Sequence, residues 1–216
     1  VDYILSGEGE EIFPQLLETL EKKQDVCLPG VSYRGHISST VAVADLKYVE
    51  SLDSPYCLPQ DQKDMGKRIL YFETSRGCPF QCQYCLSSLE QGLRFFSEDY
   101  LKRQLNLICH SSAKTIKFLD RSFNADANHA IMILDYIFKH YQEGQQFQFE
   151  INADVLNQKI IDFIREKAPK GLLRFEIGIQ STYEPTNRAV KRIQNFKRLS
   201  EVITMLMQDG QCDLHL

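Results

Sequence analysis

The sequence predicts an α/β fold built around a parallel sheet. Short runs rich in β-branched and aromatic residues recur along the chain, amphipathic helical patterns separate them, and we find no repeat of fixed sequence. Strand and helix alternating in this way imply parallel strands joined by right-handed crossovers. A barrel and a doubly wound sheet both satisfy the pattern, and periodicity alone does not choose between them.

Five strands are expected in the main part of the chain. Each run is brief and is bounded by polar or glycine-containing stretches. The expected strands cover residues 69–74, 115–119, 147–151, 174–179 and 212–216.

Four helices are expected between these strands. Ser97, Asp126 and Asn157 are side chains that cap helix N-termini, and each precedes an apolar stripe with helical spacing. A fourth stripe runs from Leu199 to Leu206, and Gly210 is a stop signal behind it.

The first third of the chain differs from the rest. Residues 1–5 read as a strand and residues 12–20 as one helix face, which makes a strand–helix unit over 1–23 that is too small to fold alone. Residues 24–66 contain turn-forming pairs such as Pro29-Gly30 and Ser54-Pro55, and we interpret them as a linker with a few short extended pieces. The main domain is therefore expected to cover residues 67–216.

Composition excludes several classes of protein. The chain has 216 residues, 43% of them hydrophobic, with 25 basic against 29 acidic residues and a net charge of −4. These values are typical of a globular protein and offer no broad basic field for nucleic acid. No apolar run is long enough for a membrane span, and the first residues do not resemble a signal peptide. The seven cysteines are an odd number in a chain too large for a disulfide scaffold, so we expect a reduced, cytoplasmic protein.

The chemistry is concentrated in a cluster of cysteines. Cys78, Cys82 and Cys85 have the spacing C-x3-C-x2-C, directly after the first expected strand of the main domain. In parallel α/β folds, active sites are built on the loops at the carboxyl ends of the strands. Three thiolates on one short loop can hold an iron–sulfur cluster, and a four-iron cluster with three protein ligands leaves one iron open. An open coordination position is typical of a catalytic site.

Three other interpretations of the cluster remain open. The cysteines could be small buried apolar residues, or a redox dithiol, or ligands of a structural zinc ion. A zinc site needs a fourth ligand, and His110 and His129 are the candidates. The remaining cysteines, which are Cys27, Cys57, Cys109 and Cys212, are interpreted as buried or incidental thiols.

With this motif and Tyr84 before its last cysteine, the sequence resembles the radical S-adenosylmethionine (radical SAM) superfamily. The stretches 73–79, 118–124 and 175–182 resemble the subgroup with a cobalamin-binding domain, whose uncharacterised members are often labelled oxidative-cyclase-like. Residues 1–10 are similar to the last strand–turn–helix of that domain.

The resemblance implies a partial (β/α)6 TIM-like barrel, cut short after about five strands and preceded by the tail of a cobalamin-binding-type α/β domain. Cys78, Cys82 and Cys85 would ligate a [4Fe–4S] cluster, and S-adenosylmethionine would bind its fourth iron. Reductive cleavage would then give methionine and a 5′-deoxyadenosyl radical that attacks a substrate. The cofactors would carry this chemistry, with cobalamin an additional cofactor of the full-length protein.

Other residues are assigned to S-adenosylmethionine binding by the same resemblance. Side chains at the carboxyl ends of the strands and on the loops beyond them are expected to contact the cofactor, with the arginine paired to its carboxylate. The expected cofactor-binding residues are Tyr84, Asp120, Glu150, Gln180, Ser181 and Arg192.

Function is therefore expected to be that of a radical SAM oxidoreductase or transferase acting on a small molecule, with a reductase or flavodoxin-type electron donor. The alternatives are a tRNA methylthiotransferase-type enzyme and a non-catalytic zinc or electron-transfer module. Because the sequence stops within the fifth strand, we expect the chain to be inactive alone, and the exposed edge of that strand to favour dimers.

Overall fold

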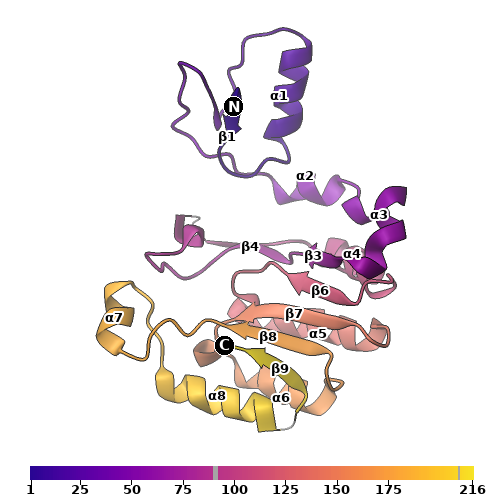
Figure 1. The fold of residues 1–216 in the computed structure, drawn as a ribbon, viewed down its shortest axis with the longest axis vertical. Helices are drawn as coiled ribbons and strands as arrows, with labels where there is room; N and C mark the ends of the chain where they lie inside the picture. The colour runs from indigo at the N-terminus through magenta and orange to yellow at the C-terminus, as the bar shows by residue number, and fades with distance from the viewer. Residues whose placement is uncertain (90–91, 209) are drawn as a thin grey trace. The chain divides into compact units, whose positions relative to one another are not determined.

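The computed structural model describes residues 1–89, 92–208 and 210–216 (Figure 1). The chain forms two compact units, Val1–Asp53 and Ser54–Leu216.

The second unit is built on a five-stranded parallel sheet. The strands pair in the order β3 (Ile69–Phe72), β6 (Thr115–Phe118), β7 (Gln146–Ile151), β8 (Leu173–Ile177) and β9 (Cys212–His215). All five strands expected from the sequence are confirmed, with ends that differ by one or two residues.

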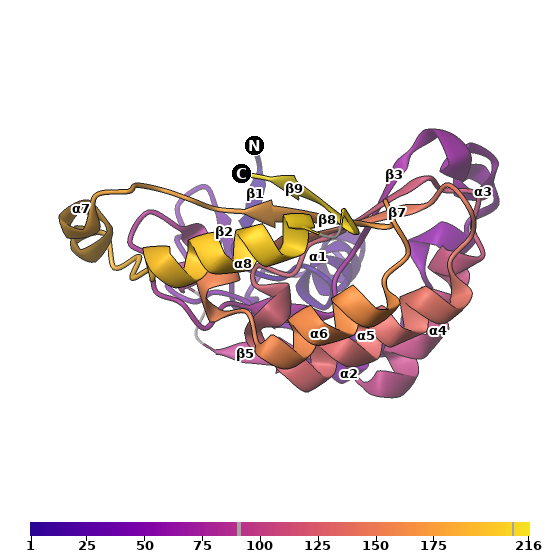
Figure 2. The same ribbon diagram turned by 90° about the horizontal axis from the view of Figure 1, so that it is seen from below.

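The order of the strands decides between the two architectures that periodicity left open. Each strand lies beside the one that precedes it in this sheet, so right-handed crossovers place every connecting helix on the same face. Figure 2 shows α4 (Glu98–Cys109), α5 (Ala127–His140), α6 (Gln158–Lys167) and α8 (Phe196–Gln208) together on that face. A doubly wound sheet would carry helices on both faces, so this sheet is part of a TIM-like barrel.

The helix starts follow the expected capping chemistry. The side chains of Ser97, Asp126 and Asn157 accept hydrogen bonds from backbone N–H groups in the first turns of α4, α5 and α6. These bonds satisfy donors that a helix N-terminus leaves free.

The two faces of the sheet differ in polarity because side chains alternate along each strand. On the helix-covered face, four phenylalanines from adjacent strands form a buried row: Phe72, Phe118, Phe149 and Phe175. Their ring centroids are 5.6, 4.3 and 6.1 Å apart in that order. The opposite face carries the intervening polar residues, which include Lys117, Glu150 and Glu176.

The outer edge of β3 is protected by a tyrosine. The hydroxyl of Tyr56 donates to the backbone oxygen of Tyr71 and accepts from its backbone nitrogen, both at 2.8 Å. Tyr56 lies in a 3₁₀ turn, Pro55–Cys57, followed by the short helix α3 (Pro59–Asp64). The tyrosine thus satisfies backbone groups that an edge strand would otherwise expose.

The first unit pairs β1 (Tyr3–Leu5) with β2 (Val31–Tyr33) in antiparallel fashion beside α1 (Ile12–Glu21). Its small core contains Ile12, Leu16 and Val31. Gly7 has φ of +101°, and a Cβ there would lie 2.1 Å from the carbonyl oxygen of Ala42, so only glycine fits.

Residues 24–66 contain more structure than the short extended pieces expected of a linker. Besides β2 and α3, they form helix α2 (Leu46–Ser51), which Asp45 caps. The chain divides between Asp53 and Ser54, whereas the expected boundary lies at residues 66–67. The assignment of residues 1–23 to a cobalamin-binding-type domain stays a prediction.

Among the residues the structure describes, no helix is both long and apolar enough to cross a membrane.

Candidate active site

The cysteine motif lies on the loop of a β-hairpin at the carboxyl end of β3. Strand β4 (Ser75–Gly77) pairs antiparallel with β5 (Leu93–Phe95), and the motif begins at the residue after β4. Gly77 closes the neck of this hairpin with φ of +90°, and a Cβ there would lie 2.1 Å from the carbonyl oxygen of Gly92. The glycine before the first cysteine is therefore needed for close approach of the two strands.

The three thiols of the motif face one cavity of about 390 Å³. Cys82 is buried, while Cys78 and Cys85 are partly buried. Burial raises the pKa of the Cys78 thiol, the thiols of Cys85 and Cys82 add to the rise, and the Arg192 guanidinium opposes it. The three cysteines are therefore gathered around the same cavity, where Arg192 is the nearby cation.

The far wall of the cavity is formed by the carboxyl ends of β7, β8 and β9 and by the segment that follows β8. Glu150 and Glu176 are paired in register on adjacent strands and both line the cavity. The other described lining residues are Phe80, Tyr84, Ile151, Ile177, Gly178, Gln180, Arg192, His215 and Leu216.

Arg192 lies against the cysteine loop and has unused hydrogen-bonding capacity. One terminal nitrogen, Nη1, is 3.9 Å from the sulfur of Cys82, and the other, Nη2, is 3.4 Å from the carbonyl oxygen of Gly178. The Nε of Arg192 is buried and has no hydrogen-bond partner among the described residues. The Oε1 of Gln194 is likewise buried without a partner, while its Nε2 donates to the same Gly178 oxygen at 2.9 Å. Buried polar atoms without partners are rare, and Arg192 also lines the cavity, so this arginine is a candidate contact for a ligand.

Four of the six expected cofactor-binding residues line the cavity, namely Tyr84, Glu150, Gln180 and Arg192. Ser181 is not among the described lining residues. Its hydroxyl accepts from the backbone nitrogen of Tyr183 at 3.1 Å, and its carbonyl accepts from the side chain of Asn187 at 2.7 Å. The structure thus places Ser181 in the turn that leads to α7 (Glu184–Ala189).

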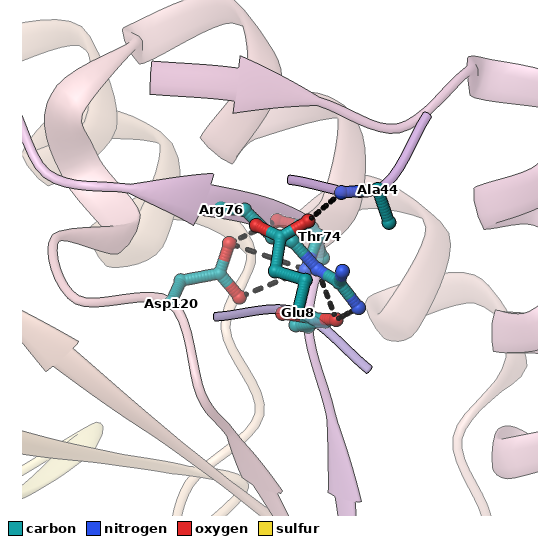
Figure 3. A network of polar contacts seen from close by, with 6 residues as sticks. Glu8, Ala44, Thr74, Arg76 and Asp120 are labelled. Carbon is teal, nitrogen blue, oxygen red and sulfur yellow. Dashed lines mark hydrogen bonds and ion pairs between the residues drawn. The ribbon is translucent and has the colours of Figure 1, made fainter. Parts of the chain in front are cut away.

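Asp120 is not among the described lining residues either, and the residue is only 1% exposed. Its carboxylate accepts hydrogen bonds from the backbone and hydroxyl of Thr74 and from the hydroxyl of Ser75 (Figure 3 shows Asp120 beside Thr74). Alternation explains this placement, because Asp120 lies two residues after Phe118 and therefore on the helix-covered face. The carboxylate of Asp120 is thus used within the protein, and the assignment of this residue to cofactor binding stays a prediction.

Sequence reasoning did not single out Glu176 as a site residue. Its carboxylate lines the cavity and forms an ion pair with Lys117, at 2.9 Å from the lysine nitrogen. The sequence does contain a signal for Glu176, because alternation places it on the same face of its strand as Gly178, opposite the apolar residues Phe175 and Ile177. His215, at the end of β9, was likewise not assigned to the cavity.

The donor set fits an iron–sulfur cluster better than a structural zinc ion. Three thiols from one loop line one cavity, whereas neither His110 nor His129 is among its described lining residues. His110 bonds the backbone oxygen of Asn106, and His129 bonds the hydroxyl of Thr74. No three His, Cys, Asp or Glu side chains in the described ranges already stand at metal-coordinating distances.

The other four cysteines are free thiols away from the cavity lining. Cys27 and Cys57 are exposed, and Cys109 and Cys212 are buried. Burial raises the pKa of both buried thiols to about 12, so they are protonated at neutral pH. This agrees with their interpretation as buried or incidental thiols.

Comparison with known protein families gives a match of residues 72–212 to the model of the radical SAM superfamily. The matched segment contains the cysteine hairpin and the barrel strands from the end of β3 to the start of β9.

Two curated proteins are similar to the chain in sequence. An uncharacterized methyltransferase, PH0819, of Pyrococcus horikoshii is 29% identical over 77% of this chain and 38% of its own length. The cobalamin-dependent radical SAM methyltransferase TokK of Streptomyces tokunonensis is 27% identical over 93% of this chain and 32% of its own length. The chain thus spans about a third of the length of these relatives.

Among solved structures, the cobalamin-dependent S-adenosylmethionine radical enzyme OxsB superimposes on the chain with a TM-score of 0.76. The match covers 99% of this chain and 32% of that protein at 20% identity. At this identity the likeness supports the fold alone, and it agrees with the partial TIM-like barrel found here.

Proposed function

Since the chain belongs to the radical SAM superfamily, we propose that its cysteine hairpin holds a [4Fe–4S] cluster and that the protein methylates a small organic substrate. The observation that carries this proposal is the cavity itself, where Cys78, Cys82 and Cys85 face Arg192 and two carboxylates across one space. When bound, the cluster supplies the electron that splits S-adenosylmethionine into methionine and a 5′-deoxyadenosyl radical.

The residues of the cavity suit the two ends of S-adenosylmethionine. Arg192 offers a planar guanidinium with a buried unpartnered nitrogen, which suits the cofactor carboxylate. Glu150 offers a carboxylate to the amino group or ribose, and Tyr84 and Gln180 line the same cavity. Glu176, held by Lys117, is a second carboxylate that faces the bound molecules.

Methyl transfer is proposed over ring formation because of the curated relatives. PH0819 and TokK are both described as methyltransferases, and the second as cobalamin-dependent. We therefore propose cobalamin as a further cofactor of the full-length protein. The reductant is proposed to be a reductase or flavodoxin-type protein, and the substrate is a small molecule rather than RNA, since the net charge is −4.

The test is a product assay on the full-length protein after anaerobic reconstitution with iron and sulfide, with cobalamin supplied. Methyl transfer from S-adenosylmethionine leaves S-adenosylhomocysteine, and reductive cleavage leaves 5′-deoxyadenosine and methionine. We expect about four irons per chain and both nucleoside products by mass spectrometry. Cleavage products without S-adenosylhomocysteine would instead favour a ring-forming or other hydrogen-abstracting reaction.

Two serine variants provide the control. Cys78→Ser removes a thiol of the hairpin, and Cys57→Ser removes an exposed thiol outside the cavity. We expect Cys78→Ser to lose the cluster and both products, and Cys57→Ser to keep them. Zinc in place of iron in the wild type, or equal iron contents in the two variants, would overturn the proposal.

A further inference from the structure

The buried carboxylate of Asp120 is the centre of a network that the cofactor chemistry does not use. Its Oδ1 is 2.6 Å from the hydroxyl oxygens of both Thr74 and Ser75, and its Oδ2 is 3.0 Å from the backbone nitrogen of Thr74. His129 Nε2 lies 2.8 Å from the same Thr74 hydroxyl. All four residues lie in the second unit: Thr74 follows β3, Ser75 begins β4, Asp120 follows β6 and His129 lies in α5.

The direction of each hydrogen bond follows from the donor inventory. Burial raises the pKa of Asp120, and the hydrogen bonds from Ser75 and Thr74 oppose that rise by stabilising the ionised carboxylate. In the ionised form the carboxylate only accepts, so Thr74 and Ser75 both donate their hydroxyl protons to Asp120. The Thr74 hydroxyl has then no proton left for His129, and the ring must donate from Nε2. Burial lowers the pKa of His129, so the neutral Nε2–H form is the one that fits. The chain of donors therefore runs from His129 through Thr74 to Asp120.

The network is attached to the base of the cysteine hairpin. Thr74 and Ser75 join β3 to β4, and the backbone oxygen of Thr74 accepts from Phe96 at 3.2 Å, just beyond β5. Only Arg76 and Gly77 separate Ser75 from Cys78. Arg76 is itself held, because its guanidinium pairs with Glu73 at 2.6 Å and lies over the Phe96 ring. Both strands of the neck are thus tied to the sheet immediately before the first cysteine.

We propose that the hydrogen-bonded set Asp120, Thr74, Ser75 and His129 is a positioning device for the cysteine hairpin. Asp120 acts through Thr74 and Ser75 and touches neither cluster nor S-adenosylmethionine. Its role is to fix the hairpin neck so that the three thiols converge on the cavity wall formed by β7 and β8. The inference rests on the proposed function for its purpose, whereas its geometry is independent of any bound cofactor.

The neighbouring strand offers a matched control network. Asn152 donates from Nδ2 to the Ser122 hydroxyl at 2.7 Å and from its backbone nitrogen to Asn124 at 2.9 Å. Ser122 and Ser75 are both buried hydroxyls at the carboxyl edge of the sheet. Their replacement by alanine deletes the same group, but only Ser75 is bonded to Asp120 and precedes the cysteines.

The experiment measures alkylation of Cys78 by iodoacetamide in the cluster-free full-length protein, peptide by peptide. Cys78 is partly buried, so its labelling depends on local opening of the hairpin. Loss of one hydrogen bond to a charged group should raise that opening about tenfold. We expect Cys78 to be labelled about tenfold faster in Ser75→Ala and Thr74→Val than in the wild type. Thr74→Ser keeps the hydroxyl and should label Cys78 at the wild-type rate, and Ser122→Ala should leave that rate unchanged.

Buried Cys109 in α4 is the internal standard. Global unfolding would expose Cys109 and Cys78 together, so acceleration of both by the same factor would overturn the positioning role. Equal Cys78 rates in Ser75→Ala and Ser122→Ala would overturn it as well. If the wild type did not bind iron, the proposed function would be wrong. The labelling rates would still test the positioning role, because they are measured on the cluster-free protein.

Discussion

The carboxyl edge of the sheet has two halves that use polar residues in opposite ways. At the β3–β6 half, the carboxylate of Asp120 is buried and its hydrogen bonds to Thr74 and Ser75 are all made within the protein. At the β7–β8 half, Arg192 lines an open cavity, and its buried Nε has no partner among the described residues. The first half is a completed structure, and the second has capacity left for a ligand.

The difference teaches which polar residues to assign to binding. A buried polar group with its hydrogen bonds made contributes to stability and holds its neighbours in place. A buried polar atom without a partner costs free energy in the unliganded protein, and a ligand that pairs with it recovers that cost. Removal of a side chain should therefore destabilise the first half and leave the stability of the second half unchanged.

The largest expected loss of stability comes from replacing Gly77, the glycine at the neck of the cysteine hairpin in the β3–β6 half. Gly77→Ala places a Cβ 2.1 Å from the backbone oxygen of Gly92 at a φ of +90°, and backbone cannot move aside as a side chain can. We expect the free energy of unfolding to fall by more than about 3 kcal/mol, or the hairpin to separate. Urea denaturation of the full-length protein measures this effect.

Gly171→Ala is the control for Gly77→Ala. Gly171 also has positive φ, +75°, but its added Cβ would meet no atom within 4 Å. Only the backbone strain remains, so a loss of about 1–2 kcal/mol is expected. Equal losses in the two variants would contradict the account of a tight neck.

A smaller change in stability compares one residue from each half, Asp120 and Arg192. Asp120→Asn replaces one acceptor oxygen by an N–H donor that faces the donors of Thr74 and Ser75, and we expect a loss of about 2 kcal/mol. Arg192→Gln removes a group with a buried unpartnered nitrogen, and we expect a change within about 0.5 kcal/mol. The same urea experiment compares them, and a greater loss for Arg192→Gln than for Asp120→Asn would reverse the assignment.

The smallest expected effect concerns the two buried thiols away from the carboxyl edge of the sheet, Cys109 and Cys212. Because the pKa values of Cys109 and Cys212 are raised to about 12, alkylation of both should remain slow at pH 8 and rise with each unit of pH. The folded state keeps these protons while the unfolded chain loses them above pH 9, so stability falls as pH rises towards 12. Peptide mass spectrometry from pH 7 to pH 10 checks the labelling, and fast labelling of Cys212 at pH 8 would contradict its burial.

Much of the fold could be predicted because local patterns and topology agree. Short runs rich in β-branched and aromatic residues located the strands, and Ser97, Asp126 and Asn157 located the starts of three helices. The choice between a barrel and a doubly wound sheet needed the pairing order, which no local pattern contains. The helix of residues 46–51 was missed because it has only six residues, fewer than two turns, and contains no buried residue.

Only part of the candidate site could be predicted, because the rest depends on which face of the sheet each residue occupies. Spacing alone located the three cysteines, but the roles of strand-end carboxylates depend on which face they occupy. Asp120 lies two residues beyond Phe118 and faces the helices, whereas Glu150 directly follows Phe149 and faces the cavity. This alternation is visible in the sequence once the phenylalanine row is known to be the buried face.

The most direct test of the account is electron paramagnetic resonance of the reduced, reconstituted full-length protein with and without S-adenosylmethionine. We predict a [4Fe–4S]⁺ signal that changes when S-adenosylmethionine is added to the wild type. In Arg192→Gln the signal should form but should need a higher concentration of S-adenosylmethionine to change. No cluster, or a wild-type signal that does not respond to S-adenosylmethionine, would contradict the claim that the hairpin and the β7–β8 half form one cofactor site.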